Sequence, residues 1–533
     1  MKTNLHKIVM GVCLSSSLMM TTGCIEETFP TSSATEDQLT ASDMATSAMV
    51  WAMPAVLNKY ATIGGSYHWD WGYGSIMHVR DVMTEDMAVI SSGYDWYSSW
   101  EQNVYQGESY IYGQFIWNYY WQAVLTTNKL IGALNPETAS EAQMGYLAAA
   151  HAFRALFYLD MARMYEFLPN TATSGTNVEG LTVPIVDENT TEEDARNNPR
   201  VPRAEMAAFI LEDLDFAEEH IEKLEERANT LPHLAAVYGL KARYYMWLEE
   251  YANAQTYARQ AIDASGLAPM TEDQCLNTSS GFNNIDCWIW GAQMVAEDDV
   301  VQTGILNWAS WMCNETSFGY SGQQPFLQIG ASLYNRISNT DFRKKMWVAP
   351  AGTALEGQTE FLTSSVFGYF GDILPEYASV KFRPAEGNCD DFTVGAATAY
   401  PLMRVEEMYF IEAEAAAQQG NNQAQSMLNS FMTQYRDSEY STTATGQDLI
   451  DEIIFQKRIE LWGEGLTFFD VKRLNMSVTR GYTGTNFSDA TRFNTNGRPA
   501  WMNICIVQTE KNNNAALIGY ENPDPSGVYE VWE

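Results

Sequence analysis

Apolar residues recur at helical spacing through two long parts of the chain. In the first part, residues 114–134, 140–167, 202–223, 232–248 and 252–264 place apolar side chains three or four positions apart. That spacing is typical of amphipathic helices. The apolar face of 202–223, for example, carries Met206, Ile210, Leu214, Ala217 and Ile221. The pattern therefore predicts a mainly α-helical protein.

Short turns join these helices, and alanine occupies many of their contact positions. This alternation resembles tetratricopeptide repeats, in which stacked helix pairs bury a face that no pair could bury alone. A second helical part follows at 401–419, 423–436 and 448–463, with a short helix after Gly465. We expect a tetratricopeptide-like helical scaffold over 42–266 that is completed by helices in 401–533.

The stretch between these two parts, residues 267–400, is rich in Gly, Ser and Asn. A structureless loop of that length is improbable inside a domain, so we expect a loop-rich subdomain on the scaffold. Residues 287–290 and 501–508 have strand-like patterns, and 81–90 is compatible with a short helix.

The first 23 residues have the pattern of a secretory signal peptide. Lys2 and Lys7 precede an apolar run over 8–20, and small residues then lead to Cys24. This end resembles a bacterial lipobox, in which the cysteine is acylated. Residues 24–41 are polar and predict a flexible tether. An ordinary signal peptide with an unrelated cysteine is the alternative.

The chain is strongly acidic, with a formal net charge of −36. Such a surface repels nucleic acid and anionic lipid headgroups, so a nucleic-acid partner is not expected. The mature cysteines have no zinc-like spacing, and the histidines form no metal-binding motif. We predict no metal and no cofactor. One disulfide, Cys275–Cys287, and calcium binding at the acidic loop 388–391 are left open.

Three blocks of the chain resemble the SusD/RagB family of outer-membrane nutrient-uptake lipoproteins. The strongest runs from Ile453 to Gly465 and on through Phe468–Arg473, with its Arg, Glu-Leu, Glu-Gly and aromatic-Asp-x-x-Arg pattern. The second spans Arg404 to Ala415, and the third begins at Arg154. A fourth, weaker pattern is carried by Trp117, Tyr120 and Asn128. Thr467 departs from the family, which usually has Arg there, so a scaffold ion pair is expected to be missing.

The resemblance implies a non-enzymatic protein that captures an oligosaccharide and delivers it to a SusC-like TonB-dependent transporter. It also implies an outer-membrane location, lipid-anchored through Cys24 and facing the cell exterior. Glu26 and Glu27 resemble the acidic signal that sends such lipoproteins to that face. We expect the tether to give slack to a lid that moves over the transporter.

Sugars offer apolar C–H faces and hydroxyl edges, so their sites need flat rings beside polar groups. Residues 67–121 hold six of the 16 Trp and nine of the 29 Tyr, and a second aromatic cluster lies in 290–320. The candidate ligand-binding residues are Trp69, Asp70, Trp71, Arg80, Trp96, Trp100, Asn103, Trp290, Trp308, Trp311 and Tyr320. For each single ring, a place in the core is the alternative.

Three other functions remain open from the sequence. The same fold could capture peptides or glycopeptides, or the chain could be a repeat-type adaptor that binds no small ligand. A secreted hydrolase is the third alternative. The neighbouring carboxylates Glu412 and Glu414 do not favour it, since residues two apart on a helix point to different faces. No nucleophile or nucleotide-binding motif occurs either.

Overall fold

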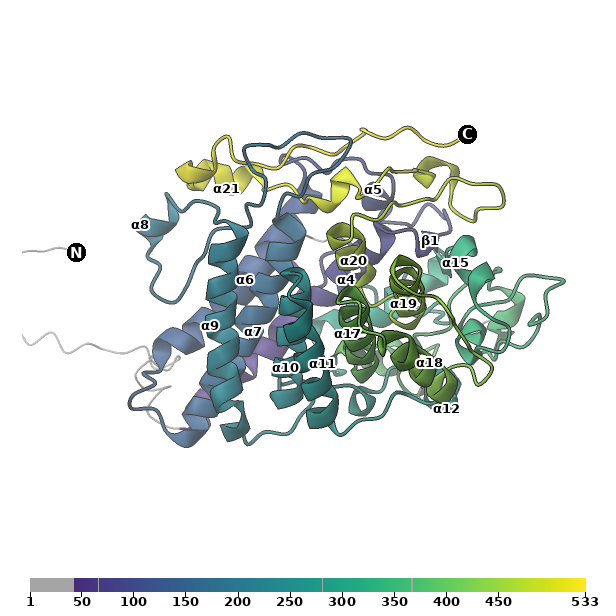
Figure 1. The fold of residues 1–533 in the computed structure, drawn as a ribbon, viewed down its shortest axis with the longest axis horizontal. Coiled ribbons are helices and arrows are strands. Elements are labelled where there is room, and N and C mark those ends of the chain that lie inside the picture. The colour runs from purple at the N-terminus through teal and green to yellow at the C-terminus, as the bar shows by residue number, and fades with distance from the viewer. Residues whose placement is uncertain (1–42, 66, 280, 366–367) are drawn as a thin grey trace, which may run out of the picture.

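The computed structural model describes residues 43–533 apart from 66, 280 and 366–367 (Figure 1). The predicted signal peptide, Cys24 and the tether over 24–41 lie outside the described residues.

A row of packed helices forms the scaffold. α6 (Ile111–Ala133) packs on α7 (Glu141–Tyr165), α7 on α9 (Arg203–His220), α9 on α10 (Leu234–Trp247), and α10 on α11 (Tyr251–Ser265) (Figure 1). The five helices predicted in this part are confirmed, with ends that differ by a few residues. The apolar face predicted for 202–223 is fully buried.

Local signals set the ends of these helices. Ser140 caps α7 by accepting the Gln143 N–H at 3.1 Å, and the Gln143 side chain accepts the Ser140 N–H at 3.0 Å. This reciprocal capping box satisfies backbone donors that the first turn leaves unpaired. Gly266 ends α11 in a left-handed conformation with φ of 62°, which glycine adopts without steric cost.

The C-terminal helices extend the row. α17 (Val405–Gln418) packs on α11, and α18 (Ala424–Tyr435) and α19 (Gln447–Glu460) pack on α17. α20 (Thr467–Arg473) follows and contacts α4 (Tyr73–Val82). The helix predicted over 401–419 begins only at Val405, because residues 399–403 pair as a strand.

The remaining helices are short and connect or cover the scaffold. They are α2 (Asp43–Val50), α3 (Ala52–Leu57), α5 (Ser98–Glu101), α8 (Glu192–Ala195), α12 (Glu272–Leu276), α13 (Asp299–Gln302), α14 (Trp308–Met312), α15 (Ala331–Arg336), α16 (Phe392–Gly395) and α21 (Gln508–Asn513). Over the described residues, none of the helices has both the length and the apolar character that crossing a membrane requires.

The described residues form three two-stranded antiparallel sheets, and two of these join segments that are distant in sequence. β1 (Met87–Val89) pairs with β3 (Leu327–Ile329), and β2 (Trp290–Gln293) pairs with β6 (Ala399–Met403). The third sheet joins β4 (Thr363–Ser364) to β5 (Gly368–Tyr369). The β1–β3 pair links the aromatic-rich N-terminal segment to the loop-rich middle of the chain.

Two predicted elements are wrong. Residues 81–90 are not one helix, because α4 ends at Val82 and β1 occupies Met87–Val89. Residues 501–508 form no strand, because a 3-10 turn over Ala500–Met502 leads into loop and then α21. In both places a run of apolar residues indicates that the segment is buried. The run alone does not show whether the segment is a helix, a strand or a loop.

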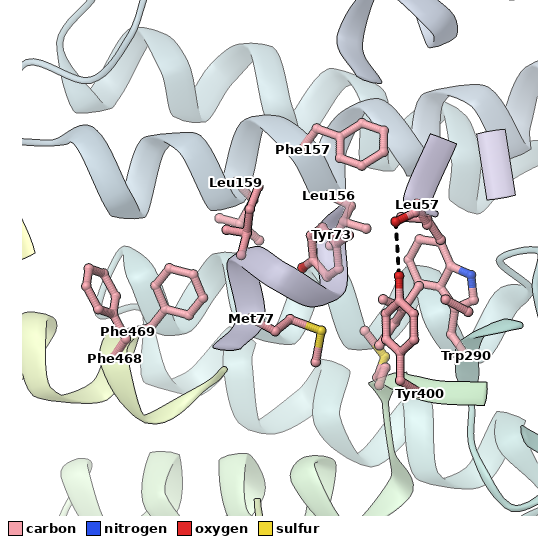
Figure 2. Packing of buried hydrophobic residues seen from close by; sticks show 14 of the residues in the cluster. Leu57, Tyr73, Met77, Leu156, Phe157, Leu159, Trp290, Tyr400, Phe468 and Phe469 are labelled. Carbon is pink, nitrogen blue, oxygen red and sulfur yellow. Dashed lines mark hydrogen bonds between the residues drawn. The ribbon is translucent and has the colours of Figure 1, made fainter. Parts of the chain in front are cut away.

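The main core lies where α4, α7 and α20 meet the β2–β6 pair. Figure 2 shows Tyr73 and Met77 of α4 between Leu156 of α7 and the rings of Phe468 and Phe469. The Tyr400 hydroxyl on β6 donates to the Leu57 carbonyl at 3.1 Å (Figure 2). Chain segments far apart in sequence thus close around one apolar interior.

Buried charges hold the C-terminal helices to the loop-rich middle. Arg404 donates to Glu464 at 2.9 Å and to Glu460 at 3.1 Å, and Arg436 donates to Glu460 at 2.6 Å. Lys381 donates to Glu464 at 2.7 Å. Four cations and four carboxylates make up this Glu460 cluster, namely Asp341, Arg343, Lys381, Arg404, Glu406, Arg436, Glu460 and Glu464.

The 453–473 motif therefore has a structural role. Arg458 adds a link of its own, because it donates to Asp86 at 2.9 Å and to Glu85 at 2.7 Å across the molecule. Thr467, the departure from the motif, is buried in the first turn of α20. The neighbouring Glu464 forms its ion pairs with Arg404 and Lys381.

Candidate functional site

The two aromatic clusters predicted from the sequence pack against each other. The Trp71 and Trp308 ring centroids lie 6.4 Å apart, and those of Tyr97 and Trp311 lie 4.8 Å apart. His68 contacts Tyr320 edge-on at 5.5 Å. Segments more than 200 positions apart in sequence thus form one network of rings.

Most of the predicted ligand-binding side chains lie inside the protein. All of them except Trp96 are at most 6% exposed. They are Trp69, Asp70, Trp71, Arg80, Trp100, Asn103, Trp290, Trp308, Trp311 and Tyr320. Their rings and polar groups contact other parts of the chain, so in this structure they present little surface to a ligand. Of the predicted residues, Trp96 is therefore the one whose side chain is exposed enough to contact a ligand directly.

The buried polar candidates have structural partners. Arg80 donates to Asp160 at 2.8 Å, and Asp160 also accepts from the Tyr73 hydroxyl at 2.6 Å. Asp70 accepts from Thr62 Oγ1 at 2.9 Å, although burial still raises its pKa. Asn103 holds the C-terminal segment by donating to the carbonyl of Pro525 at 2.7 Å.

Trp290 is separate from the other candidate rings. It lies on β2, packs on Phe153 with ring centroids 4.9 Å apart, and donates its indole N–H to the Thr230 carbonyl at 3.2 Å. These contacts place it in the scaffold core rather than with the aromatic network.

One end of the ring network reaches the surface. Trp96 is 40% exposed and stacks on His68, with ring centroids 4.0 Å apart and planes 13° from parallel. His68 is hydrogen-bonded through Nδ1 to the Tyr320 hydroxyl, and Tyr320 stacks on the buried Trp311 at 4.1 Å. We call His68, Trp96 and Tyr320 the aromatic patch. Successive ring contacts fix the orientation of its outermost indole.

Polar groups border the aromatic patch along the chain. Gln323 and Gln324 are exposed and follow Tyr320 by three and four positions. Partial burial lowers the pKa of His68, which keeps its imidazole neutral at neutral pH. A neutral imidazole suits an uncharged, hydroxyl-rich ligand.

A second exposed ring pair ends another branch of the same network. Tyr105 is 50% exposed and Tyr110 41% exposed, and their ring centroids lie 5.1 Å apart. Tyr112 connects Tyr105 to the buried Trp100. Neither this pair nor His68 was among the residues predicted from the sequence. The only sequence signal is their place in a segment dense in Tyr and Trp.

The residues considered for metal and disulfide chemistry have other contacts. Cys275 and Cys287 are both free thiols. In the acidic loop, Asp390 accepts from Ser317 Oγ at 3.1 Å, and Asp391 caps α16. Among the described residues, no group of three or more His, Cys, Asp or Glu is placed to hold a metal ion.

Two family models match the chain. The model described as the SusD family matches residues 380–527, and the model described as starch-binding associating with outer membrane matches residues 37–246. No curated protein matches the chain.

Solved structures share the fold. A SusD-like carbohydrate binding protein from Bacteroides vulgatus is 21% identical with a TM-score of 0.69, and the match covers 90% of this chain and 98% of that one. A SusD superfamily protein from Bacteroides thetaiotaomicron is 18% identical with a TM-score of 0.67, covering 90% and 100%. Surface glycan-binding protein A from Bacteroides uniformis is 16% identical with a TM-score of 0.60, covering 90% and 99%.

Proposed function

The chain belongs to the SusD/RagB family, and on that premise we propose that it binds an oligosaccharide at the aromatic patch. The family is one of glycan-binding proteins associated with the outer membrane. The observation that carries the proposal is the exposed Trp96 indole, stacked on His68 and fixed in orientation by the rings behind it.

The chemistry of the patch fits a sugar better than a charged ligand. The apolar C–H face of a pyranose packs on an indole, and its hydroxyl groups need neutral donors and acceptors such as the amides of Gln323 and Gln324. Because the patch is already ordered, binding costs little conformational entropy. A peptide ligand would gain less binding free energy, since no side chain of the aromatic patch pairs with a charged terminus.

We further propose that the protein delivers its ligand to a SusC-like TonB-dependent transporter at the cell exterior. In this proposal Cys24 carries the lipid anchor and residues 24–41 are the tether.

Replacing Cys24 with Ser should release the protein from membranes. Purification of the wild-type protein from membranes should bring a large β-barrel protein with it. Normal uptake after the tether is shortened would contradict the role of the tether as slack.

The central experiment is a binding assay on a panel of oligosaccharides and peptides, followed by calorimetry on the best ligand. Trp96→Ala should weaken binding about tenfold or more, since one aromatic contact contributes roughly 0.5–1.5 kcal/mol beyond the area it buries. Trp51→Ala is the matched control, because Trp51 is also 40% exposed but lies outside the patch. Binding only to peptides, or products formed from the glycan, would overturn the proposal.

A further inference from the structure

A small cavity rich in cationic side chains lies on the scaffold, apart from the aromatic patch. Its volume is about 110 Å³, and residues of α7, α9, α10, α17, α19 and α20 line it. Seven Arg or Lys side chains line the cavity against four carboxylates. This local excess of positive charge stands out in a chain with a net charge of −36.

Most of these cations have a carboxylate partner. Arg203 pairs with Glu166 at 2.6 Å, and Arg243 pairs with Glu407 at 2.6 Å. Similar pairs neutralise Arg163, Lys457 and Arg473 through Asp160, Asp470 and Glu414. Two cations of the lining remain, and Glu249 is the carboxylate of the lining that lies outside these pairs.

Lys472 and Arg498 are those remaining cations. Lys472 is 2% exposed, and its ammonium donates to the Met164 carbonyl at 2.8 Å. Arg498 donates to the carbonyls of Lys472 at 2.6 Å and Pro169 at 2.8 Å. Within the described part of the chain, no carboxylate oxygen lies within 4.0 Å of either cationic group.

These two cations have unused capacity for hydrogen bonds. An ammonium group has three N–H donors, and that of Lys472 makes one hydrogen bond within the described part of the chain. Arg473 also lines the cavity, and its Nη1 is buried without a partner among the described residues. Burial lowers the pKa of Lys472 well below its usual value; Glu166 opposes this shift, and the nearby Arg498, Arg200 and Arg203 add to it. An anion in the cavity would remove the repulsion between the charged Lys472 and these arginines.

We propose that this cavity binds one small oxyanion through Lys472, Arg473 and Arg498. Charge-assisted N–H donors from Lys and Arg are the groups that bind phosphate, sulfate and carboxylate oxygens. A volume of about 110 Å³ is well below the roughly 300 Å³ at which pockets for organic ligands begin, so the occupant is an ion or a single acidic group. The site does not depend on glycan binding at the aromatic patch.

Calorimetry on the purified full chain tests the proposal with inorganic phosphate, sulfate and acetate at constant ionic strength. We expect one saturable site, and the three anions show whether a tetrahedral ion or a carboxylate fits better. Lys472→Met and Arg498→Gln should each weaken binding at least tenfold. Lys345→Met is the matched control, because Lys345 pairs with Glu272 elsewhere and its loss should leave the affinity unchanged.

Crystals soaked in selenate locate the ion independently of the variants. An anomalous peak within hydrogen-bond distance of Lys472 Nζ supports the proposal, and a peak elsewhere overturns it. If Lys472→Met does not fold, the anion affinity of Arg498→Gln, at the more exposed edge of the cavity, still tests the proposal by calorimetry. No binding of any of the three anions to the wild-type chain would overturn the proposal. Trp96→Ala should bind the anion like the wild type.

Discussion

Replacing Arg404 with Met tests whether the Glu460 cluster holds the scaffold together. The Arg404 side chain is fully buried and makes ion pairs with Glu406 at 3.0 Å, Glu460 at 3.1 Å and Glu464 at 2.9 Å. Methionine fills similar space but removes the charge. The cluster would then hold four carboxylates against three cations, with a net negative charge in the protein interior.

The expected cost follows from that uncompensated charge. Removing one partner of a buried ion pair typically costs about 3–5 kcal/mol, because the remaining charge stays desolvated. This is a large part of the roughly 5–15 kcal/mol by which native proteins are stable. Adding Glu464→Gln restores the balance to three cations and three carboxylates. The double variant should therefore lose less stability than the sum of the two single variants, by about 1–3 kcal/mol.

Urea unfolding followed by circular dichroism measures these differences. Arg196→Met is the control, because Arg196 pairs with Glu192 at the surface, where the side chains are 62% and 85% exposed. Such exposed pairs contribute at most about 1 kcal/mol. If Arg404→Met cost no more than Arg196→Met, or if the double variant were simply additive, the balanced-cluster argument would be refuted.

Two further predictions concern the helical scaffold. Burial alone would raise the pKa of Asp160, but Arg80 and Arg163 hold it at about 2, below the 3.8 of an unperturbed Asp. The ion pairs of Asp160 with these two arginines therefore add about 2 kcal/mol of stability above pH 4, and this contribution is lost as the pH falls toward 2. The difference in unfolding free energy between the wild type and Asp160→Asn should narrow over that range in urea titrations. Gly145→Ala should lower the thermal midpoint despite the better helix propensity of alanine, because its Cβ would lie 2.5 Å from a backbone nitrogen. Gly113→Ala on α6, where the nearest atom is 3.5 Å away, should not lower it, and equal effects at both sites would contradict the packing argument.

The helices were predictable because their signal is local. An apolar face such as Met206 to Ile221 and a capping pair such as Ser140 and Gln143 are complete within one element. The ion pairs of Glu460 depend on the tertiary structure, because its partner Arg343 comes from a segment without any matching pattern.

The ligand-binding residues were harder to predict because exposure is a property of the tertiary structure. Trp96 and Trp100 lie four positions apart in one aromatic segment, yet one is 40% and the other 1% exposed. The difference arises because Trp100 packs on Trp69 and Tyr112, whereas Trp96 has His68 on one face and solvent on the other. The cationic cavity draws its residues from six helices, so no single stretch of sequence indicates it.

The most direct test of the central claim is a crystal structure of the protein with the best oligosaccharide from the binding panel. We predict one pyranose ring lying flat on the exposed face of Trp96, with carbon atoms about 4 Å from the indole. We also predict that the indole keeps its stacking on His68. An oligosaccharide bound at another surface, with Trp96 in contact only with solvent, would contradict the account.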